Sequence, residues 1–156
     1  MGTTEHKGGP EASDPGASGG LDGLVILVAE DEAIIAMDLE WTLEEAGAER
    51  VQLAVSNAEA QGFLVAEPPD AVLLDLNLAD GEAEATAAKA RELGIPLVFH
   101  SGHGARDQLE ARFPGVCVLS KPSPAQSIVE ALARVVGQTE AHAGAHVKMQ
   151  VAPATA

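Results

Sequence analysis

The chain has 156 residues, of which 46% are hydrophobic and 21% are charged, which is enough for one core of ordinary domain size and short for two. Twenty-four acidic and nine basic residues give a formal net charge of -15, which repels nucleic-acid phosphates and anionic membrane surfaces, so we expect no nucleic-acid or membrane partner. Neither a signal peptide nor a membrane-spanning apolar run is evident, so we expect a cytoplasmic protein.

Composition divides the chain into three parts. Residues 1–20 are mostly Gly, Ser, Pro and polar types, and we expect a disordered N-terminal lead because they bury too little apolar surface to offset the cost of ordering. Residues 138–156 show no sustained apolar periodicity and are expected to form a flexible C-terminal tail. One folded domain is therefore predicted over residues 21–137.

Short apolar runs alternate with longer amphipathic stretches inside this domain. The runs predict strands over residues 24–29, 51–55, 71–74, 96–99 and 116–119. The stretches between and after them predict helices over residues 32–46, 57–66, 82–93, 105–112 and 124–136. Repeated strand–helix alternation predicts a parallel sheet with helices on both faces.

Three smaller features complete this prediction. Ser123, with Gln126 three residues later, is typical of a capping box that starts the last helix. Trp41 and Phe63 are expected to pack their helices against the sheet. Cys117 lies in an apolar run and is expected to be buried.

Reactive side chains follow four of the predicted strands. Glu30 and Asp31 follow the first strand, Asp75 the third, Ser101 the fourth and Lys121 the fifth. In a parallel sheet the carboxyl ends of the strands carry the functional residues, beside the point where the strand order reverses. The three carboxylates are ligands that Mg²⁺ prefers, and with a cation present Asp75 can attack a phosphoryl group. Lys121 would neutralise one phosphoryl oxygen, and Ser101 would donate a hydrogen bond to another.

This pattern resembles the receiver domains of response regulators in two-component signalling. The matching positions appear in the family's order and at compatible separations: Glu30-Asp31, Leu74-Asp75-Leu76, Ser101 and Lys121-Pro122. The resemblance covers residues 21–137. It implies a flavodoxin-like (CheY-like), doubly wound, five-stranded parallel sheet with five helices.

The resemblance also implies a function. Asp75 would accept a phosphoryl group from a phosphohistidine on a sensor histidine kinase or phosphotransfer protein. Mg²⁺ would be held by Glu30, Asp31, Asp75 and the backbone carbonyl of Asn77. A cis peptide bond before Pro122 is implied as well.

Residues 99–104 further resemble the FAT GUY subgroup of stand-alone receivers, whose motif runs Phe-Ala-Thr-Gly-x-Tyr. The match is partial, because His100 replaces the small residue and Gly104 stands where the subgroup has tyrosine. Val118 occupies the position where receivers often carry an aromatic residue that moves on phosphorylation. We therefore expect the signal to use the Ser101 loop, Phe99 or backbone shifts near the fourth helix.

The expected output is contact with an unknown downstream protein, or service as a phosphate sink or relay, because no output module follows the predicted domain. We expect a phosphoacceptor regulator and not an enzyme. The alternative is a phosphohydrolase that forms an aspartyl phosphate, which is disfavoured because such enzymes carry a second aspartate where this chain has Asn77. A nucleotide-binding module would need a glycine-rich loop after the first strand, and a receiver that signals without phosphorylation would not need the complete set of site residues.

The same residues have plainer interpretations. Asp75 can cap a turn, and Glu30 and Asp31 can favour the start of a helix. Lys121 can be an ordinary surface lysine. His100 and His103 have the spacing of metal ligands, and with Cys117 a zinc site can be imagined, although two histidines in a loop are a nonspecific pattern.

Overall fold

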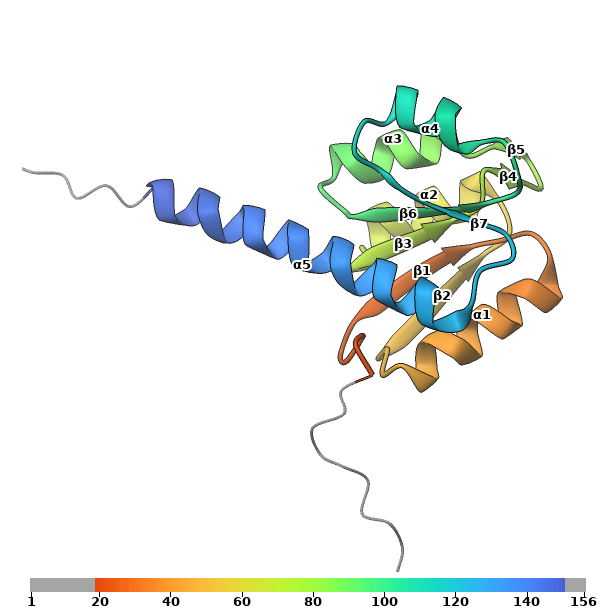
Figure 1. Ribbon diagram of the computed structural model, residues 1–156, viewed down its shortest axis with the longest axis horizontal. Coiled ribbons are helices and arrows are strands. Elements are labelled where there is room, and N and C mark those ends of the chain that lie inside the picture. Colours follow the sequence, from red (N-terminus) through yellow and green to blue (C-terminus); the bar gives the residue numbers. More distant parts are fainter. Residues whose placement is uncertain (1–18, 151–156) are drawn as a thin grey trace, which may run out of the picture.

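The computed structural model describes the backbone of residues 19–150 and the side chains of residues 19–141 (Figure 1). Its centre is a five-stranded sheet in the order β2-β1-β3-β6-β7, in which all neighbouring strands are parallel. The strands are β1 (Val25–Ala29), β2 (Arg50–Ala54), β3 (Ala71–Leu74), β6 (Leu97–Ser101) and β7 (Cys117–Ser120). The predicted flavodoxin-like, doubly wound sheet is therefore confirmed.

Helices cover both faces of this sheet. They are α1 (Ala33–Glu45), α2 (Asn57–Ala66), α3 (Glu84–Glu92), α4 (Arg106–Arg112) and α5 (Ala125–Gln150). Helices α1 and α5 lie on one face, and α2, α3 and α4 lie on the other (Figure 1). The chain runs from β1 outward to β2 and then crosses back to β3, so the strand order reverses between β1 and β3. In such sheets a crevice opens at this point, at the carboxyl ends of the strands.

The two faces of the sheet bury two separate apolar clusters. Alternate residues point to opposite faces of a strand, so Leu74 and Phe99 join the cluster under α2, α3 and α4, whereas Leu73 and Val98 join the cluster under α1 and α5. Strand β3 is buried along its whole length. This burial explains why its sequence is a continuous apolar run and not an alternating one.

Replacing Phe99 with alanine should lower the free energy of unfolding by about 3–5 kcal/mol, because it leaves a cavity in the core. The Phe99 ring is fully buried, and its centroid lies 5.7 Å from that of Phe113. Urea unfolding of wild type and variant measures the change. The matched control is Val65→Ala at an exposed site on α2, where a change within about 0.5 kcal/mol is expected. Equal effects at the two sites would contradict the assignment of Phe99 to the core.

Two short strands were not predicted. β4 (Asn77–Leu78) and β5 (Gly81–Glu82) form an antiparallel pair directly after Asp75. The Ala83 N–H closes this segment by donating to the Leu76 carbonyl at 2.7 Å. Strands of two residues have no readable periodicity, so pattern reasoning cannot find them.

Two packing predictions and one capping prediction are wrong. The Trp41 side chain is 64% exposed, because it lies on the outer face of α1, and Cys117 is only partly buried. Helix α5 begins at Ala125, and the Ser123 hydroxyl donates to the Ser120 carbonyl at 2.7 Å instead of capping this helix.

The last helix is also longer than predicted. Its expected end was residue 136, but α5 continues through Gly137 to Gln150. A single glycine costs only about 1 kcal/mol in a helix, and the residues around it favour helix, so Gly137 does not end it. None of the described helices is long and apolar enough to cross a membrane. The N-terminal lead predicted over residues 1–20 lies almost entirely outside the described residues, as do the last six residues of the predicted tail.

Candidate functional site

Strand register brings the ends of β1 and β3 together at the switch point. Ala29 pairs with Leu74, and Leu74 pairs with Phe99 on the other side. The Asp75 N–H donates to the Ala29 carbonyl at 3.0 Å. The residues that follow these strands, Glu30 and Asp75, are therefore held side by side by backbone pairing.

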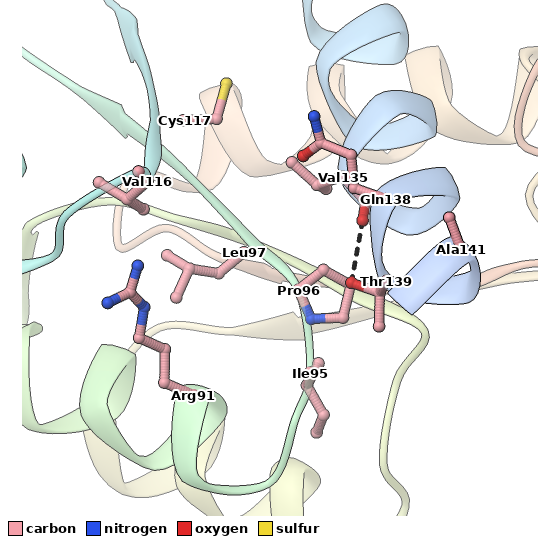
Figure 2. Close-up of a pocket in the computed structure, with 11 residues that line it drawn as sticks. Arg91, Ile95, Pro96, Leu97, Val116, Cys117, Val135, Gln138, Thr139 and Ala141 are labelled. Atoms are coloured by element: carbon pink, nitrogen blue, oxygen red, sulfur yellow. Dashed lines mark hydrogen bonds between the residues drawn. The ribbon is translucent and has the colours of Figure 1, made fainter. Parts of the chain in front are cut away.

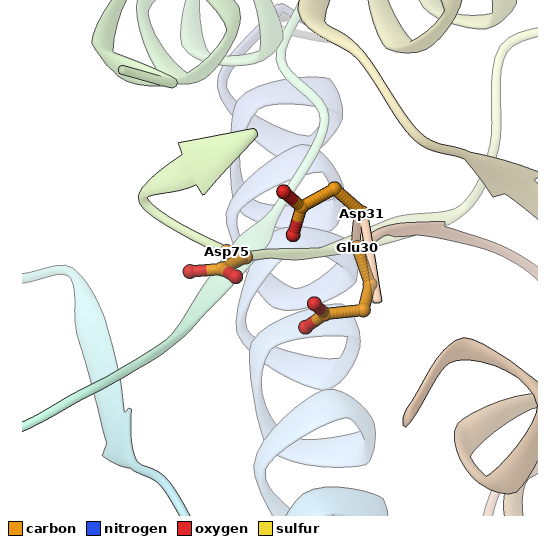
Figure 3. A group of neighbouring side chains, drawn as sticks. All are labelled: Glu30, Asp31 and Asp75. Carbon is orange, nitrogen blue, oxygen red and sulfur yellow. The ribbon is translucent and has the colours of Figure 1, made fainter. Parts of the chain in front are cut away.

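Three carboxylates meet at this edge. Glu30, Asp31 and Asp75 each offer one oxygen, and these atoms all lie within 4.8 Å of one another (Figure 3). Glu30 is 2% exposed and Asp75 is 9% exposed, whereas Asp31 faces solvent. The cluster is therefore deep on one side and open on the other, so a cation or phosphoryl group can approach from the open side.

Lys121 completes this cluster from the far end of the sequence. Its Nζ lies 2.6 Å from Glu30 Oε2 and 2.9 Å from Asp75 Oδ2, and its side chain is 20% exposed. The Lys121 N–H donates to the Ser101 carbonyl at 2.7 Å, which continues the pairing of β6 and β7. The peptide bond between Lys121 and Pro122 is cis, as predicted. One ammonium group thus bridges two of the three carboxylates.

Burial and pairing have opposite effects on the pKa values of Glu30 and Lys121. Burial raises the pKa of Glu30, although hydrogen bonds from the Lys121 ammonium and the Glu32 N–H oppose the shift. Burial alone would lower the pKa of Lys121, but the hydrogen bonds to Glu30 and Asp75 outweigh it and raise that pKa above its usual value. Lys121 therefore stays charged at neutral pH.

The two remaining predicted site residues lie at the same edge. Ser101 is buried and is the last residue of β6. Because Leu74 pairs with Phe99, Asp75 is level with His100, and Ser101 lies one position further along the strand. Asn77 begins β4, and its backbone N–H donates to Asp75 Oδ1 at 3.3 Å. Both oxygens of Asp75 are thus engaged, one by Asn77 and the other by Lys121.

Sequence reasoning missed the position of His100. Its side chain is 5% exposed, and neither ring nitrogen has a hydrogen-bond partner among the described residues. Burial lowers the pKa of His100, and the positive charge of Lys121 lowers it further. The alternation of side chains along β6 indicates the position of His100, because it lies two residues after Val98 and must point to the same face of the sheet, the one covered by α1 and α5. The imagined zinc site is not formed: within the part of the chain that the structure describes, the three acids are the one metal-type cluster.

A cavity lies away from this site, at the amino-terminal ends of β6 and β7 (Figure 2). It has a volume of about 580 Å³, and α5 forms one wall, where the Thr139 hydroxyl donates to the Val135 carbonyl at 3.0 Å. Its lining residues include Arg91 and Cys117 but no carboxylate. The reactive groups therefore gather at the opposite edge of the sheet.

The fold and this edge define a class of protein: α/β domains with an acidic pocket and a lysine at the carboxyl ends of a parallel sheet. The family model of the response regulator receiver domain matches residues 26–133. The chain belongs to this family, and it contains a receiver domain of two-component signalling.

Two solved structures and one curated protein illustrate the relationship. A response regulator receiver protein from Sinorhizobium medicae WSM419 is 30% identical with a TM-score of 0.69, over 76% of this chain and 98% of that one. The response regulator PhyR from Brucella abortus is 28% identical with a TM-score of 0.69, over 83% of this chain and 56% of that one. The transcriptional regulatory protein PdtaR of Mycobacterium tuberculosis (strain ATCC 25618 / H37Rv) is 32% identical over 117 residues, which are 72% of this chain and 57% of PdtaR.

The chain spans little more than half of PdtaR and 38% of the curated PhyR of Methylorubrum extorquens. The activities and partners of those whole proteins are therefore not carried over by the match. The narrower likeness to the FAT GUY subgroup stays a prediction.

Proposed function

We propose that this protein is a response regulator that accepts a phosphoryl group on Asp75. The observation that carries this proposal is the position of the Lys121 ammonium, 2.9 Å from Asp75 and 2.6 Å from the buried Glu30. A lysine held at a carboxylate near the surface supplies a counter-charge for a second negative group that arrives at the same place. A turn cap or a helix start would need neither the lysine nor three clustered acids.

The residues present fit a Mg²⁺ ion. The donor set is all oxygen, and one face of it is open, so solvent and phosphoryl oxygens can complete an octahedral site. Glu30, Asp31 and Asp75 would hold the metal together with the Asn77 carbonyl. When bound, the metal neutralises the charges that would otherwise repel an incoming phosphoryl group.

The proposed reaction is a displacement at phosphorus. An oxygen of Asp75 attacks, the P–N bond of the donor phosphohistidine breaks, and its electron pair stays on the leaving imidazole, which takes up a proton. Lys121 would follow the negative charge from Asp75 to a phosphoryl oxygen, and the Ser101 hydroxyl would donate to another. These two residues therefore position and stabilise the group while Asp75 forms the bond.

The phosphoryl donor is proposed to be a sensor histidine kinase or a phosphotransfer protein. The receiver domain would then pass the signal to a downstream protein by contact, or act as a phosphate sink or relay. The likeness to PhyR and PdtaR supports a regulatory role, since both are named as regulators.

The proposed route to a partner passes through α4. The guanidinium of Arg106, the first residue of α4, donates to the Val118 carbonyl at 2.8 Å and ties this helix to β7. Val118 has no ring to rotate, so the signal needs another route. A shift of the backbone near Ser101 would move the neighbouring strand β7, and the bond from Arg106 to the Val118 carbonyl would pass this movement to α4. This route replaces the aromatic movement that many receivers use.

The test is to incubate the protein with Mg²⁺ and acetyl phosphate and to measure its intact mass. We expect the addition of one phosphoryl group, loss of this addition when EDTA replaces Mg²⁺, and conversion of Asp75 to homoserine after borohydride reduction. No added mass under any condition would overturn the proposal. Sustained turnover of a phosphomonoester would favour the phosphohydrolase instead.

A further inference from the structure

A second cavity lies between α1, α5 and the loop after β7. Its volume is about 520 Å³, which is within the range of sites for small molecules. Ile34, Ile35 and Leu39 of α1 line it together with Ile128 of α5. The wall is therefore largely apolar, and side chains from α1, β6, the loop after β7 and α5 build it.

His100 is the unusual residue of this wall. The side chain is 5% exposed and lines the cavity, yet neither Nδ1 nor Nε2 has a hydrogen-bond partner among the described residues. Buried polar groups nearly always find a partner, and an unpaired one lowers stability unless something else binds it. Because burial and the neighbouring Lys121 lower the pKa of His100, the ring is neutral at pH 7 and offers one donor and one acceptor.

The charges around the cavity select the kind of ligand. A cation would have to leave water for a largely apolar wall whose one carboxylate, Asp38, is exposed and stays hydrated. An anion gains little, because Glu30 and Asp75 already pair with this lysine and Asp38 adds a further negative charge to the wall. A neutral molecule avoids both costs, and its apolar part can pack against the isoleucines.

We propose that this cavity binds a small neutral molecule with an apolar ring or chain and a hydroxyl group, and that the hydroxyl pairs with the His100 imidazole. The ring nitrogens are covered in the described structure, so a small rotation of the imidazole toward the cavity accompanies binding. The cavity shares Lys121 with the acidic site but is lined by none of the three clustered carboxylates, and the inference does not rest on phosphorylation of Asp75.

The test uses the unphosphorylated protein, labelled at the isoleucine methyl groups, and compares 4-methylphenol with toluene. We expect 4-methylphenol to shift the methyl signals of Ile35 and Ile128 in a saturable way and to bind at least about fivefold more tightly than toluene, since one hydrogen bond separates the two probes. In His100→Phe, which keeps an aromatic ring, this preference should fall to within about twofold. Absence of saturable shifts at these methyls, or an unchanged preference in His100→Phe, would overturn the proposal.

A second variant keeps the test independent of any change at the buried His100. Ile34 is an exposed residue at the rim of the cavity, and Met37 is an exposed residue of the same helix that does not line it. Ile34→Asp should weaken 4-methylphenol binding at least about threefold, because it replaces apolar wall with charge. Met37→Asp should leave the affinity within about twofold of wild type. Equal effects of the two substitutions would count against this cavity as the binding site.

Discussion

Replacing Asp75 with asparagine is expected to reduce phosphorylation by acetyl phosphate to background, a loss of at least about a hundredfold. An amide has the shape of the carboxylate but lacks the charge and the nucleophilic oxygen. The fold should survive, because the amide oxygen of the Asp75→Asn variant can still accept from the Asn77 N–H, and Lys121 keeps its contact with Glu30. Intact mass after incubation with Mg²⁺ and acetyl phosphate measures the loss.

The matched control for this experiment is Asp38→Asn. Asp38 is an exposed aspartate of α1 outside the acidic cluster, so its replacement should leave labelling unchanged. Circular dichroism and urea unfolding of both variants separate loss of chemistry from loss of structure. If Asp75→Asn were labelled as fully as wild type, the phosphoryl group would sit on another residue and the assignment of Asp75 would be wrong.

How far the sequence predicts this site depends on the scale of the feature. Asp75 and Lys121 can be predicted because each follows an apolar run, and parallel strands must place such residues on one edge. The bond from Lys121 to Glu30 was not derivable in the same way. It joins residues 91 positions apart, and only the strand order and the burial of the carboxylate decide that the two side chains meet.

The sequence does not predict how deeply the His100 and Trp41 side chains are buried, because burial depends on which elements pack against them in the fold. The spacing of His100 and His103 suggests metal ligands, whereas the His100 side chain is a buried ring in a cavity wall, with no hydrogen-bond partner among the described residues. Trp41 is predicted to pack α1 against the sheet, but α1 uses Ala36, Leu39 and Leu43 for that contact. A large aromatic ring predicts burial only when its face of the helix is known. Helix α2 matches its predicted range of residues 57–66, and its start carries a local sequence signal, because the Ser56 side chain accepts from the Glu59 N–H.

Replacing Lys121 with methionine should have the largest effect on stability of any change at the site, about 2–4 kcal/mol at neutral pH. It removes the cation from two carboxylates, one of which, Glu30, is almost fully buried. Urea unfolding measures the loss. Lys89→Met is the control, since the Lys89 ammonium is partly exposed, lies 3.6 Å from the exposed Glu92, and should change stability by less than about 0.5 kcal/mol.

The size of this loss should depend on pH in a defined direction. The pKa of Glu30 is already raised above 4.5 in the folded protein, and without the ammonium it rises further. A raised carboxyl pKa means that folding takes up a proton, so stability falls as the pH rises from 4.5 through the folded-state pKa. The pKa of Lys121 is raised in the wild type, so Lys121 stays charged throughout this pH range and does not alter the direction in which stability changes with pH. The variant should therefore be closest to wild type near about pH 5 and furthest from it near about pH 7.5.

The same variant separates metal binding from phosphorylation. With the ammonium gone, Glu30, Asp31 and Asp75 keep their oxygens but lose a competing cation, so Mg²⁺ should bind Lys121→Met at least as tightly as wild type, and saturating Mg²⁺ should restore part of the lost stability. Phosphorylation by acetyl phosphate should nevertheless fall, because the variant has no ammonium group to neutralise the phosphoryl oxygen that Lys121 would contact. Titration calorimetry with Mg²⁺ and the labelling assay on one protein sample measure both. A parallel loss of metal affinity and labelling would show instead that Lys121 only holds the carboxylates in place.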